Sequence, residues 1–412
     1  MNKNIKLAVA GAVLALSASA NAGIIIPAGD WTLDIGGNVN TFMTNTRSTG
    51  IADIRGGYSS FVAGPNSTTE KTESNITTGL LPNYLSVSGS TRQNDLDVAF
   101  TISLNPGSST TQGGRQSGQQ ENRQAFLTFG DKSWGSVKLG KDLGVFAGTA
   151  ILNDMTLLGV GANAGNSGVS TTLGGIGTGY IYAAWKGQVA YTTPNMNGFQ
   201  ATVGITNPNQ GIANSVDGLG GANASATGGL YQDRFGLEGK ASYSFAADAF
   251  SGKIWVGGAS YKVKYGDLTT TTASKEYSAT AADIGVNVNA GNAGLTGYYY
   301  TGEGVGTTLF LGNGYHATLG KRDSDGGYLQ ATYVLPTKTK LGVAFGRSNL
   351  DKANGEGNTA MVDSNERTTV GLYHPLTKHL NLVGEWNQIE TKAHSGIKNE
   401  NTTGSLGAIL FF

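Results

Sequence analysis

The sequence predicts an all-β protein, a transmembrane antiparallel β-barrel of about 16 strands with short turns on one side and long loops on the other. Three observations predict it: hydrophobicity alternates with period two, short and long connectors alternate, and the last residues form an amphipathic strand. The composition agrees, because only 39% of the 412 residues are hydrophobic and 64 are Gly. A large solid core would need more apolar residues.

The N-terminus predicts a signal peptide. Two lysines and an apolar stretch, Leu7–Leu16, precede an A-x-A cleavage site at Ala20–Ala22. About ten apolar residues are too few to cross a ~30 Å hydrocarbon core as a helix. We therefore expect residues 1–22 to be removed and residues 23–412 to form the barrel. No later apolar run approaches the ~18 residues of a spanning helix, so a membrane-spanning mature chain would cross with strands.

Charge and residue usage exclude several function classes. The 28 basic and 28 acidic residues cancel, whereas a nucleic-acid partner calls for a basic excess. No Cys is present, which excludes a disulfide scaffold, a thiol nucleophile and Cys-ligated zinc. The four His show no metal-ligand spacing, and no G-x-S-x-G elbow marks a nucleophile. We expect no enzyme, cofactor or metal, and a barrel-embedded hydrolase is the less favoured alternative.

Alternation with period two runs along most of the chain. From Leu96 to Asn105 apolar residues occupy every second position, and Asp, Thr, Ser and Asn stand among those between them. The segments 31–43, 199–205 and 284–288 alternate in the same way. Polar residues such as Asp, Asn and Gln suit a face turned to water. A soluble β-sandwich also alternates, so this pattern alone leaves both folds open.

The connectors separate these two folds. Short turns are expected at 91–95, 131–133, 193–197, 290–293, 336–339 and 375–378. Between the hairpins lie long stretches rich in Gly, Ser, Thr and Asn, at 45–78, 146–179, 207–232, 303–325 and 351–364. Such alternation is typical of a barrel whose turns all lie on one side of a membrane.

The C-terminus predicts closure of the barrel. Thr403–Phe412 is amphipathic, with Leu406, Leu410 and Phe412 on one face. A free strand of this kind would be an exposed edge prone to aggregation. Pairing it with residues 31–44 removes both edges and satisfies every backbone group within lipid.

Several segments together resemble one known family, the trimeric general porins of Gram-negative outer membranes. The matching segments are Asn122–Leu127 followed by Trp134–Lys141, Tyr191–Phe199, and Lys321–Ser324 with Gln330–Tyr333 and Lys338–Gly342. The match is patchy over Trp31–Phe412 and leaves the loops out. By this resemblance, Phe412 matches the sorting signal that the outer-membrane assembly machinery reads.

The resemblance implies a location and partners. The protein would be exported through the periplasm and would reside in the outer membrane, among lipid and lipopolysaccharide, as a homotrimer. Periplasmic chaperones and the barrel-assembly machinery would act during its biogenesis. The short turns would be periplasmic and the long loops extracellular. The implied function is passive diffusion of small hydrophilic solutes and ions through a water-filled channel.

The resemblance also implies a pore constriction. In this family the third extracellular loop folds into the barrel, which makes 146–179 the candidate loop. Arg123 and Lys141 match positions of basic wall residues, and Tyr84 stands where enteric members often carry another Arg. The loop contains one charged residue, Asp154, so the acidic cluster of cation-preferring members is missing. We expect a neutral to weakly basic constriction with a slight anion preference.

Strand parity near the basic residues is ambiguous. An inward Arg123 places Leu127 and Phe129 inward too, whereas hydrophobicity favours the reverse. Aromatic residues near strand ends are expected in interfacial girdles, namely Trp31, Trp134, Tyr298, Tyr299, Tyr300, Trp386 and Phe412.

Two further classes are alternatives to a general diffusion channel. A substrate-specific uptake channel would differ only in the loop residues that build a solute site. A secreted adhesin or β-solenoid would show a fixed sequence repeat, and we find none.

Overall fold

A computed structural model describes most of the mature chain. It covers residues 23–50, 54–56, 71–109, 122–162, 171–207, 228–231, 233–267, 275–316 and 318–412. The expected signal peptide, 1–22, lies outside these residues.

Most of the described residues form β-strands. The strands are β1 (Ile24–Ala28), β2 (Trp31–Thr49), β3 (Thr72–Thr77), β4 (Tyr84–Gln93), β5 (Leu96–Leu104), β6 (Ala125–Asp131), β7 (Gly135–Leu143), β8 (Trp185–Thr192), β9 (Phe199–Thr206), β10 (Gly228–Tyr231), β11 (Gly236–Ala246), β12 (Phe250–Asp267), β13 (Lys275–Ala290), β14 (Ala293–Glu303), β15 (Tyr315–His316), β16 (Gly320–Lys321), β17 (Asp323–Val334), β18 (Lys340–Leu350), β19 (Val362–Pro375), β20 (Leu380–Ala393) and β21 (Lys398–Phe411). The helix α1 (Gly148–Asn153) and the 3-10 helix η4 (Met155–Leu158) lie between β7 and β8.

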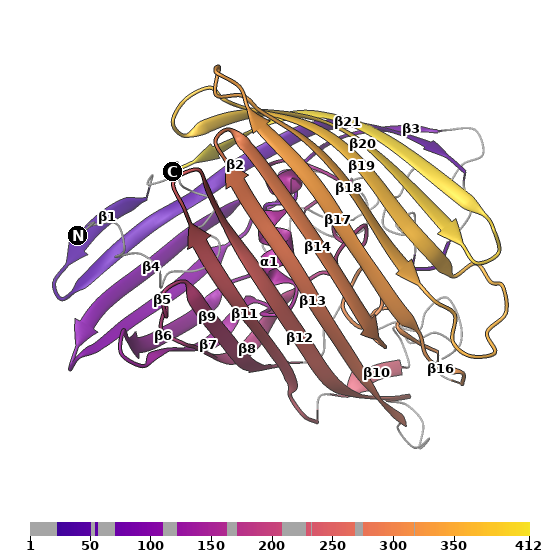
Figure 1. Cartoon of the computed structure of the whole chain (residues 1–412), viewed down its shortest axis with the longest axis horizontal. Helices are drawn as coiled ribbons and strands as arrows, with labels where there is room; N and C mark the ends of the chain where they lie inside the picture. The colour runs from indigo at the N-terminus through magenta and orange to yellow at the C-terminus, as the bar shows by residue number, and fades with distance from the viewer. Residues whose placement is uncertain are drawn as a thin grey trace.

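Sixteen antiparallel strands form a closed barrel, as predicted. The ring consists of β2, β4–β9, β11–β14 and β17–β21, with β1, β3 and β10 added along β2 and β12 (Figure 1). The ring closes where β2 pairs with β21, from Asn38 opposite Phe411 to Thr49 opposite Glu400. This confirms the predicted pairing of the C-terminal strand with the first long strand, so neither strand is left as an open edge.

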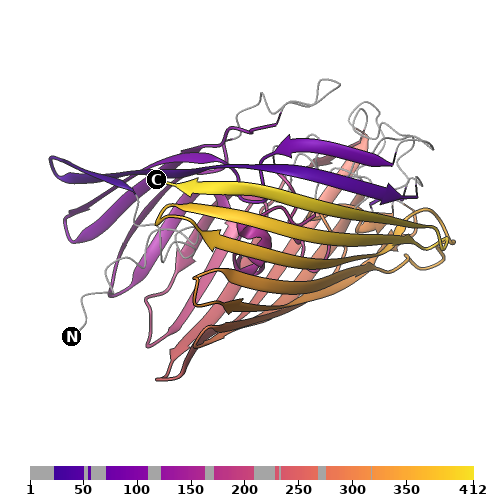
Figure 2. The same ribbon diagram turned by 90° about the horizontal axis from the view of Figure 1, so that it is seen from above.

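Short turns lie at one end of the barrel and long connections at the other (Figure 2). In the turn between β4 and β5, Asn94 and Asp95 have positive φ of 48° and 61°, the left-handed conformation that tight hairpin turns favour. All six predicted short turns join adjacent antiparallel strands. A further turn, between β11 and β12, carries no Gly or Pro to signal it and was not predicted.

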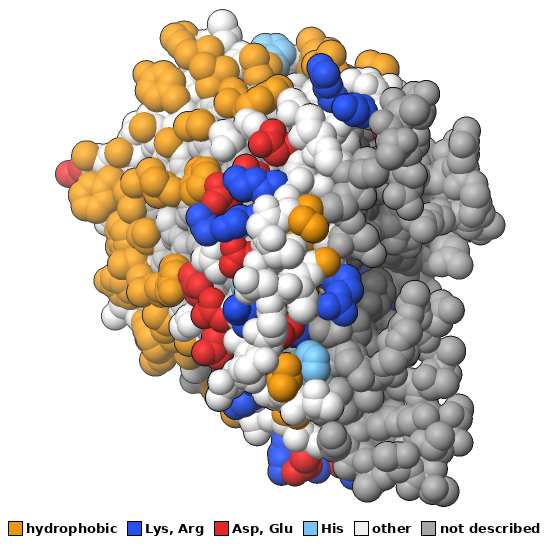
Figure 3. All heavy atoms as spheres, turned by 90° about the vertical axis from the view of Figure 1, so that its right-hand side faces the viewer, with side chains coloured by type: hydrophobic (Ala, Val, Ile, Leu, Met, Phe, Trp, Pro, Cys, Tyr) orange, Lys and Arg blue, Asp and Glu red, His pale blue; other side chains and the backbone are white. Residues whose placement is uncertain are grey.

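The outer face of the barrel is apolar. Along β2, Val39 and Met43 are 55% and 61% exposed, whereas Asn38 and Asn40 on either side of Val39 are 1% and 2% exposed. Many large hydrophobic side chains of other strands are likewise exposed on the outside. Charged side chains gather at the long-loop end, beside this hydrophobic flank (Figure 3). None of the described helices has the length and hydropathy needed to span a bilayer.

The largest apolar core lies inside the barrel. Tyr298 and Tyr300 of β14 are buried on the inner face, and Trp255 of β12 stacks beside Tyr298. The prediction that Tyr298 and Tyr300 belong to an interfacial aromatic girdle is therefore wrong. Tyr299, which lies between them, does face outward. Gly285 on β13 makes room for this packing, because a Cβ there would lie 2.1 Å from the Trp255 ring.

Candidate constriction of the lumen

The connection between β7 and β8 folds into the barrel. We call residues 144–184 the inward segment, of which the structure describes 144–162 and 171–184. It includes α1 and η4, which lie within the ring of strands (Figure 1). Its two ends meet where the Gly144 N–H donates to the carbonyl of Ala184 at 2.8 Å. The segment therefore enters and leaves the lumen at one place on the wall.

A buried carboxylate on β11 holds the start of the inward segment. Glu238 Oε2 accepts the backbone N–H groups of Val145 at 2.8 Å and Phe146 at 3.0 Å. Its other oxygen contacts the Lys186 ammonium and the Tyr261 hydroxyl. Both partners of the Lys186–Glu238 ion pair are fully buried, so the charge of Lys186 is neutralised within the wall.

The inner faces of β13, β17 and β20 hold the rest of the segment. Asp283 Oδ2 accepts the backbone N–H of Ala147 at 3.3 Å, and Gln330 Oε1 accepts that of Met155 at 2.8 Å. Glu385 Oε2 accepts the N–H groups of two further residues, Val160 at 2.9 Å and Gly161 at 2.7 Å. Side chains of the wall therefore fix the backbone of the segment at several places around the ring, including Ser348 of β18, whose Oγ accepts the Gly179 N–H at 2.9 Å.

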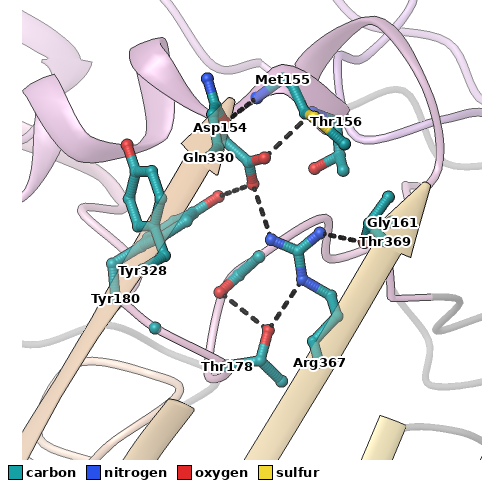
Figure 4. Close-up of polar contacts among 12 residues, drawn as sticks. Asp154, Met155, Thr156, Gly161, Thr178, Tyr180, Tyr328, Gln330, Arg367 and Thr369 are labelled. Atoms are coloured by element: carbon teal, nitrogen blue, oxygen red, sulfur yellow. Dashed lines mark hydrogen bonds and ion pairs between the residues drawn. The ribbon is translucent and has the colours of Figure 1, made fainter. Parts of the chain in front are cut away.

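Asp154 is turned into the wall rather than into the open lumen (Figure 4). It is 3% exposed, and its Oδ1 accepts the N–H of Thr156 at 2.9 Å. Its Oδ2 accepts the Tyr180 hydroxyl at 2.8 Å and lies 3.7 Å from Arg367 Nη2. Arg367 on β19 also donates to Thr369 Oγ1 at 2.6 Å. Asp154 thus helps to position the segment, and its charge is balanced by Arg367.

The lumen side of the segment is uncharged where the structure describes it. Thr149, Leu152, Asn153 and Leu158 keep partial exposure, whereas the neighbouring residues are mostly buried. Helix α1 has no acidic residue in its first turn and no basic residue in its last turn.

The opposite wall remains accessible to water. The inner faces of β13–β21 are mostly buried, but the inward positions of β4 and β5, such as Ser86, Ser88 and Thr101, keep partial exposure. A ring of 16 strands is too wide for side chains to fill. The inward positions that keep exposure, on β4 and β5 and at Lys240 of β11 and Lys253 of β12, mark the open path, whereas Lys186 of β8 is buried.

Two lysines on this open wall lack an acidic partner. Lys240 on β11 and Lys253 on β12 take inward positions, and among the described residues neither makes an ion pair or hydrogen bond. Lys240 lies close enough to Lys253 and Lys138 for their charges to repel. Lys138, in contrast, contacts Asp142 four residues along β7.

Tyr84 is the wall candidate that the structure places on the lumen side. It takes the same face of β4 as Ser86, and it packs against the core formed around the inward segment. Its strand neighbour Leu85 points outward together with Leu104 on β5.

Arg123 and Lys141 lie elsewhere. Leu127 on β6 is 45% exposed and faces outward together with Ala125, whereas Arg123 precedes this strand and is 7% exposed. Lys141 is paired with Ala125 in this outward register and donates to the Asn122 carbonyl at 2.7 Å. The Arg123 guanidinium lies 5.9 Å from the ring of Trp185, an outward residue of β8. The contacts of Asp154 are with Thr156, Tyr180 and Arg367, and Leu127 takes the outward face that hydrophobicity favours.

Sequence reasoning missed the side chains of the wall that hold the backbone of the inward segment. Glu238 interrupts an otherwise small and apolar start of β11, and Glu385 interrupts the apolar start of β20. A carboxylate at a single inward position was the available signal. Among the described residues, no three His, Asp or Glu side chains group in a way that could hold a metal ion.

Comparisons with known proteins agree on one kind of protein. A family model described as Gram-negative porin matches residues 7–394. Three solved structures are similar: the outer membrane channel DcaP of Acinetobacter baumannii (TM-score 0.66, 15% identity, 94% of this chain and 99% of that chain), the anion-selective porin from Comamonas acidovorans (0.58, 13%, 93% and 100%) and the trimer form of OmpT of Vibrio cholerae (0.51, 13%, 93% and 99%). No curated protein sequence matches this chain.

Proposed function

Because this chain belongs to the Gram-negative porin family and forms an outer-membrane channel, we propose that small hydrophilic solutes and ions diffuse passively through it, with a weak preference for anions. One observation carries the anion preference. Lys240 and Lys253 stand without acidic partners on the open wall, while the facing side of the inward segment is uncharged where described.

The physical basis is electrostatic. An ion in a wide aqueous channel keeps most of its hydration and avoids the large desolvation cost of hydrocarbon. Fixed charges act over a Debye length of about 8–10 Å at physiological ionic strength. Two unpaired ammonium groups therefore raise the local anion concentration near the narrow part of the lumen. The similar fold of the anion-selective Comamonas porin supports the proposal.

We assign the constriction to the inward segment and the wall opposite it. Thr149, Leu152 and Asn153 form the uncharged side, and Tyr84 belongs to the facing wall. Asp154 acts here by positioning the loop. We do not assign Arg123 or Lys141 to the constriction, because Lys141 takes the outward register of β7 and Arg123, 7% exposed, lies over the ring of Trp185.

Reversal potentials in planar bilayers under a KCl gradient test the anion preference. We expect chloride to be favoured by the unmodified protein, and the preference to vanish in Lys240→Gln/Lys253→Gln. Lys262→Gln is the matched control, because Lys262 is an outward residue of β12 paired with Glu276. A clear cation preference of the unmodified protein would contradict the proposal, as would an unchanged reversal potential in the double variant.

The same bilayers distinguish general diffusion from specific uptake. A general channel conducts in proportion to salt, whereas saturable block by one sugar or anion would indicate a substrate-specific channel. We also propose that the protein has no catalytic activity, since the family is one of channels. Hydrolysis of detergent-dispersed lipid or peptide by purified protein would overturn that statement.

We further propose a homotrimer in lipid and lipopolysaccharide, assembled with periplasmic chaperones and the barrel-assembly machinery. The trimer form of the similar Vibrio OmpT supports the trimer. Phe412 is the proposed assembly signal: its backbone is held at the closure, where the Gly37 N–H donates to its carbonyl at 2.8 Å. Semi-native electrophoresis of membrane extracts, with and without heating, measures the oligomer directly.

A further inference from the structure

A second connection also folds into the barrel. We call residues 304–314, between β14 and β17, the inner loop. Val305, Phe310 and Leu311 of this loop are buried. The loop closes on itself, since the Leu311 N–H donates to the Val305 carbonyl at 2.8 Å. It is therefore a compact body inside the ring.

The inner loop touches both ends of the inward segment. At the start of the segment, the Phe310 ring lies 6.0 Å from the Phe146 ring, centroid to centroid. At its end, the Tyr182 N–H donates to the Thr308 carbonyl at 2.9 Å. Thr308 also packs against Gly177, where an added Cβ would lie 2.5 Å from Thr308 Oγ1. A shift of the inner loop would therefore move both ends of the segment.

A buried ion pair outside the membrane-spanning strands anchors the inner loop. Arg322 Nε and Nη2 donate to Glu356 Oε2 and Oε1 at 2.8 Å and 2.6 Å. Both side chains are almost fully buried, at 0% and 4% exposure. Arg322 Nη1 donates to the Asn313 carbonyl at 2.8 Å, and its backbone carbonyl accepts the Gly304 N–H at 3.0 Å. Arg322 thus holds both ends of the inner loop, while Glu356 comes from the loop between β18 and β19.

We propose that Arg322 and Glu356 are positioning residues for the constriction. They hold the inner loop, and through it they fix the two ends of the inward segment, which sets how often the open path closes. The proposal rests on the channel function proposed above but not on its ion preference. An event at the extracellular loops that separates Arg322 from Glu356 would then reach the narrow part of the lumen.

The chemistry of the pair favours such a role. The planar guanidinium matches both carboxylate oxygens at once, which a lysine ammonium cannot do. Removing one partner of a buried pair leaves an uncompensated charge and is strongly destabilising. The loss would fall on the loop that Arg322 holds, because the other charge pairs of the lumen, such as Lys186–Glu238, do not involve it.

Single-channel recording of Glu356→Gln, Arg322→Gln and Arg322→Lys tests the proposal. We expect the rate of spontaneous closures at fixed voltage to rise at least about tenfold in both Gln variants. Arg322→Lys should give an intermediate rate, because it keeps the charge and loses the bidentate geometry. Arg347→Gln is the matched control: it breaks the exposed Arg347–Glu366 pair of β18 and β19 and should close at the unmodified rate.

The reversal potential of the same channels separates the two proposals. It should stay unchanged in all four variants, because none alters Lys240 or Lys253. A raised closure rate in channels without anion preference would support the positioning role while refuting the selectivity. Unchanged closure rates in Glu356→Gln and Arg322→Gln would overturn the positioning role. So would failure of both Gln variants to assemble, since the pair would then hold the whole barrel rather than the constriction.

Discussion

Replacing Asp154 by Asn removes the one charge of the candidate constriction loop and should change closure rather than selectivity. The Asp154 carboxylate lies 3.7 Å from Arg367 Nη2. Two unit charges about 4 Å apart attract by about 4 kcal/mol at an effective dielectric constant of about 20. The Asn amide oxygen can still accept the Thr156 N–H, so we expect a net loss of about 2–3 kcal/mol. Displaced conformations of the segment would then be about 30- to 150-fold more populated.

The assay is single-channel recording of Asp154→Asn beside the unmodified protein. More frequent closures with an unchanged reversal potential are expected, because the carboxylate faces the wall and not the ion path. The reasoning is refuted if Asp154→Asn shifts the reversal potential as much as Lys240→Gln/Lys253→Gln while closures stay unchanged. That result would mean that the Asp154 charge acts on passing ions.

Three further predictions address the outer face of the barrel, the Arg322–Glu356 ion pair and assembly in cells. Leu329→Lys, on the outward face of β17, should lower the free energy of unfolding in lipid by about 2–4 kcal/mol. Urea titration in liposomes measures this change, and a lysine introduced at an inward position is the control. Burial alone would raise the pKa of Glu356, but hydrogen bonds from Arg322 and the Ala353 N–H outweigh it and lower this pKa below the ordinary 4.5. The Arg322–Glu356 ion pair is therefore intact above pH 4.5 and is lost as the pH falls through the lowered pKa. The closure rates of the unmodified protein and of Glu356→Gln should become equal only in that acidic range. Phe412→Ala should leave refolding into lipid intact and reduce the amount of barrel assembled in cells; equal amounts in cells would exclude Phe412 as the signal.

The barrel wall was predictable because lipid and water impose opposite demands on alternate residues. In β2, β5, β9 and β13 the apolar positions face outward as the alternation predicts, and the C-terminal strand closes the ring. The run Tyr298–Tyr300 was not predictable, since three consecutive aromatic residues show no alternation. Tyr298 packs against Tyr328, whose hydroxyl donates to the Ala150 carbonyl of the inward segment, and local sequence does not reveal such a partner.

The interior of the lumen was predictable only in outline. The inward segment is fixed by side chains far away in sequence: Glu385 binds the backbone of Gly161 across 224 residues, and Gln330 binds that of Met155 across 175. No local pattern signals such pairs. The direction of the Asp154 carboxylate depends equally on Arg367, which lies on β19. A charged residue in a loop therefore predicts a site without predicting which way the charge points.

The seam between β2 and β21 has a consequence for the time course of folding. It joins Thr46 to Thr403, whose hydroxyls lie 2.8 Å apart across 357 residues of chain. Contacts of such sequence separation form slowly. Until β2 pairs with β21, one side of β2 presents unpaired backbone N–H and C=O groups that other strands can bind. Closure of the ring is thus expected to be the slow final step of biogenesis. Shielding the open edge of β2 until then would prevent aggregation through that edge.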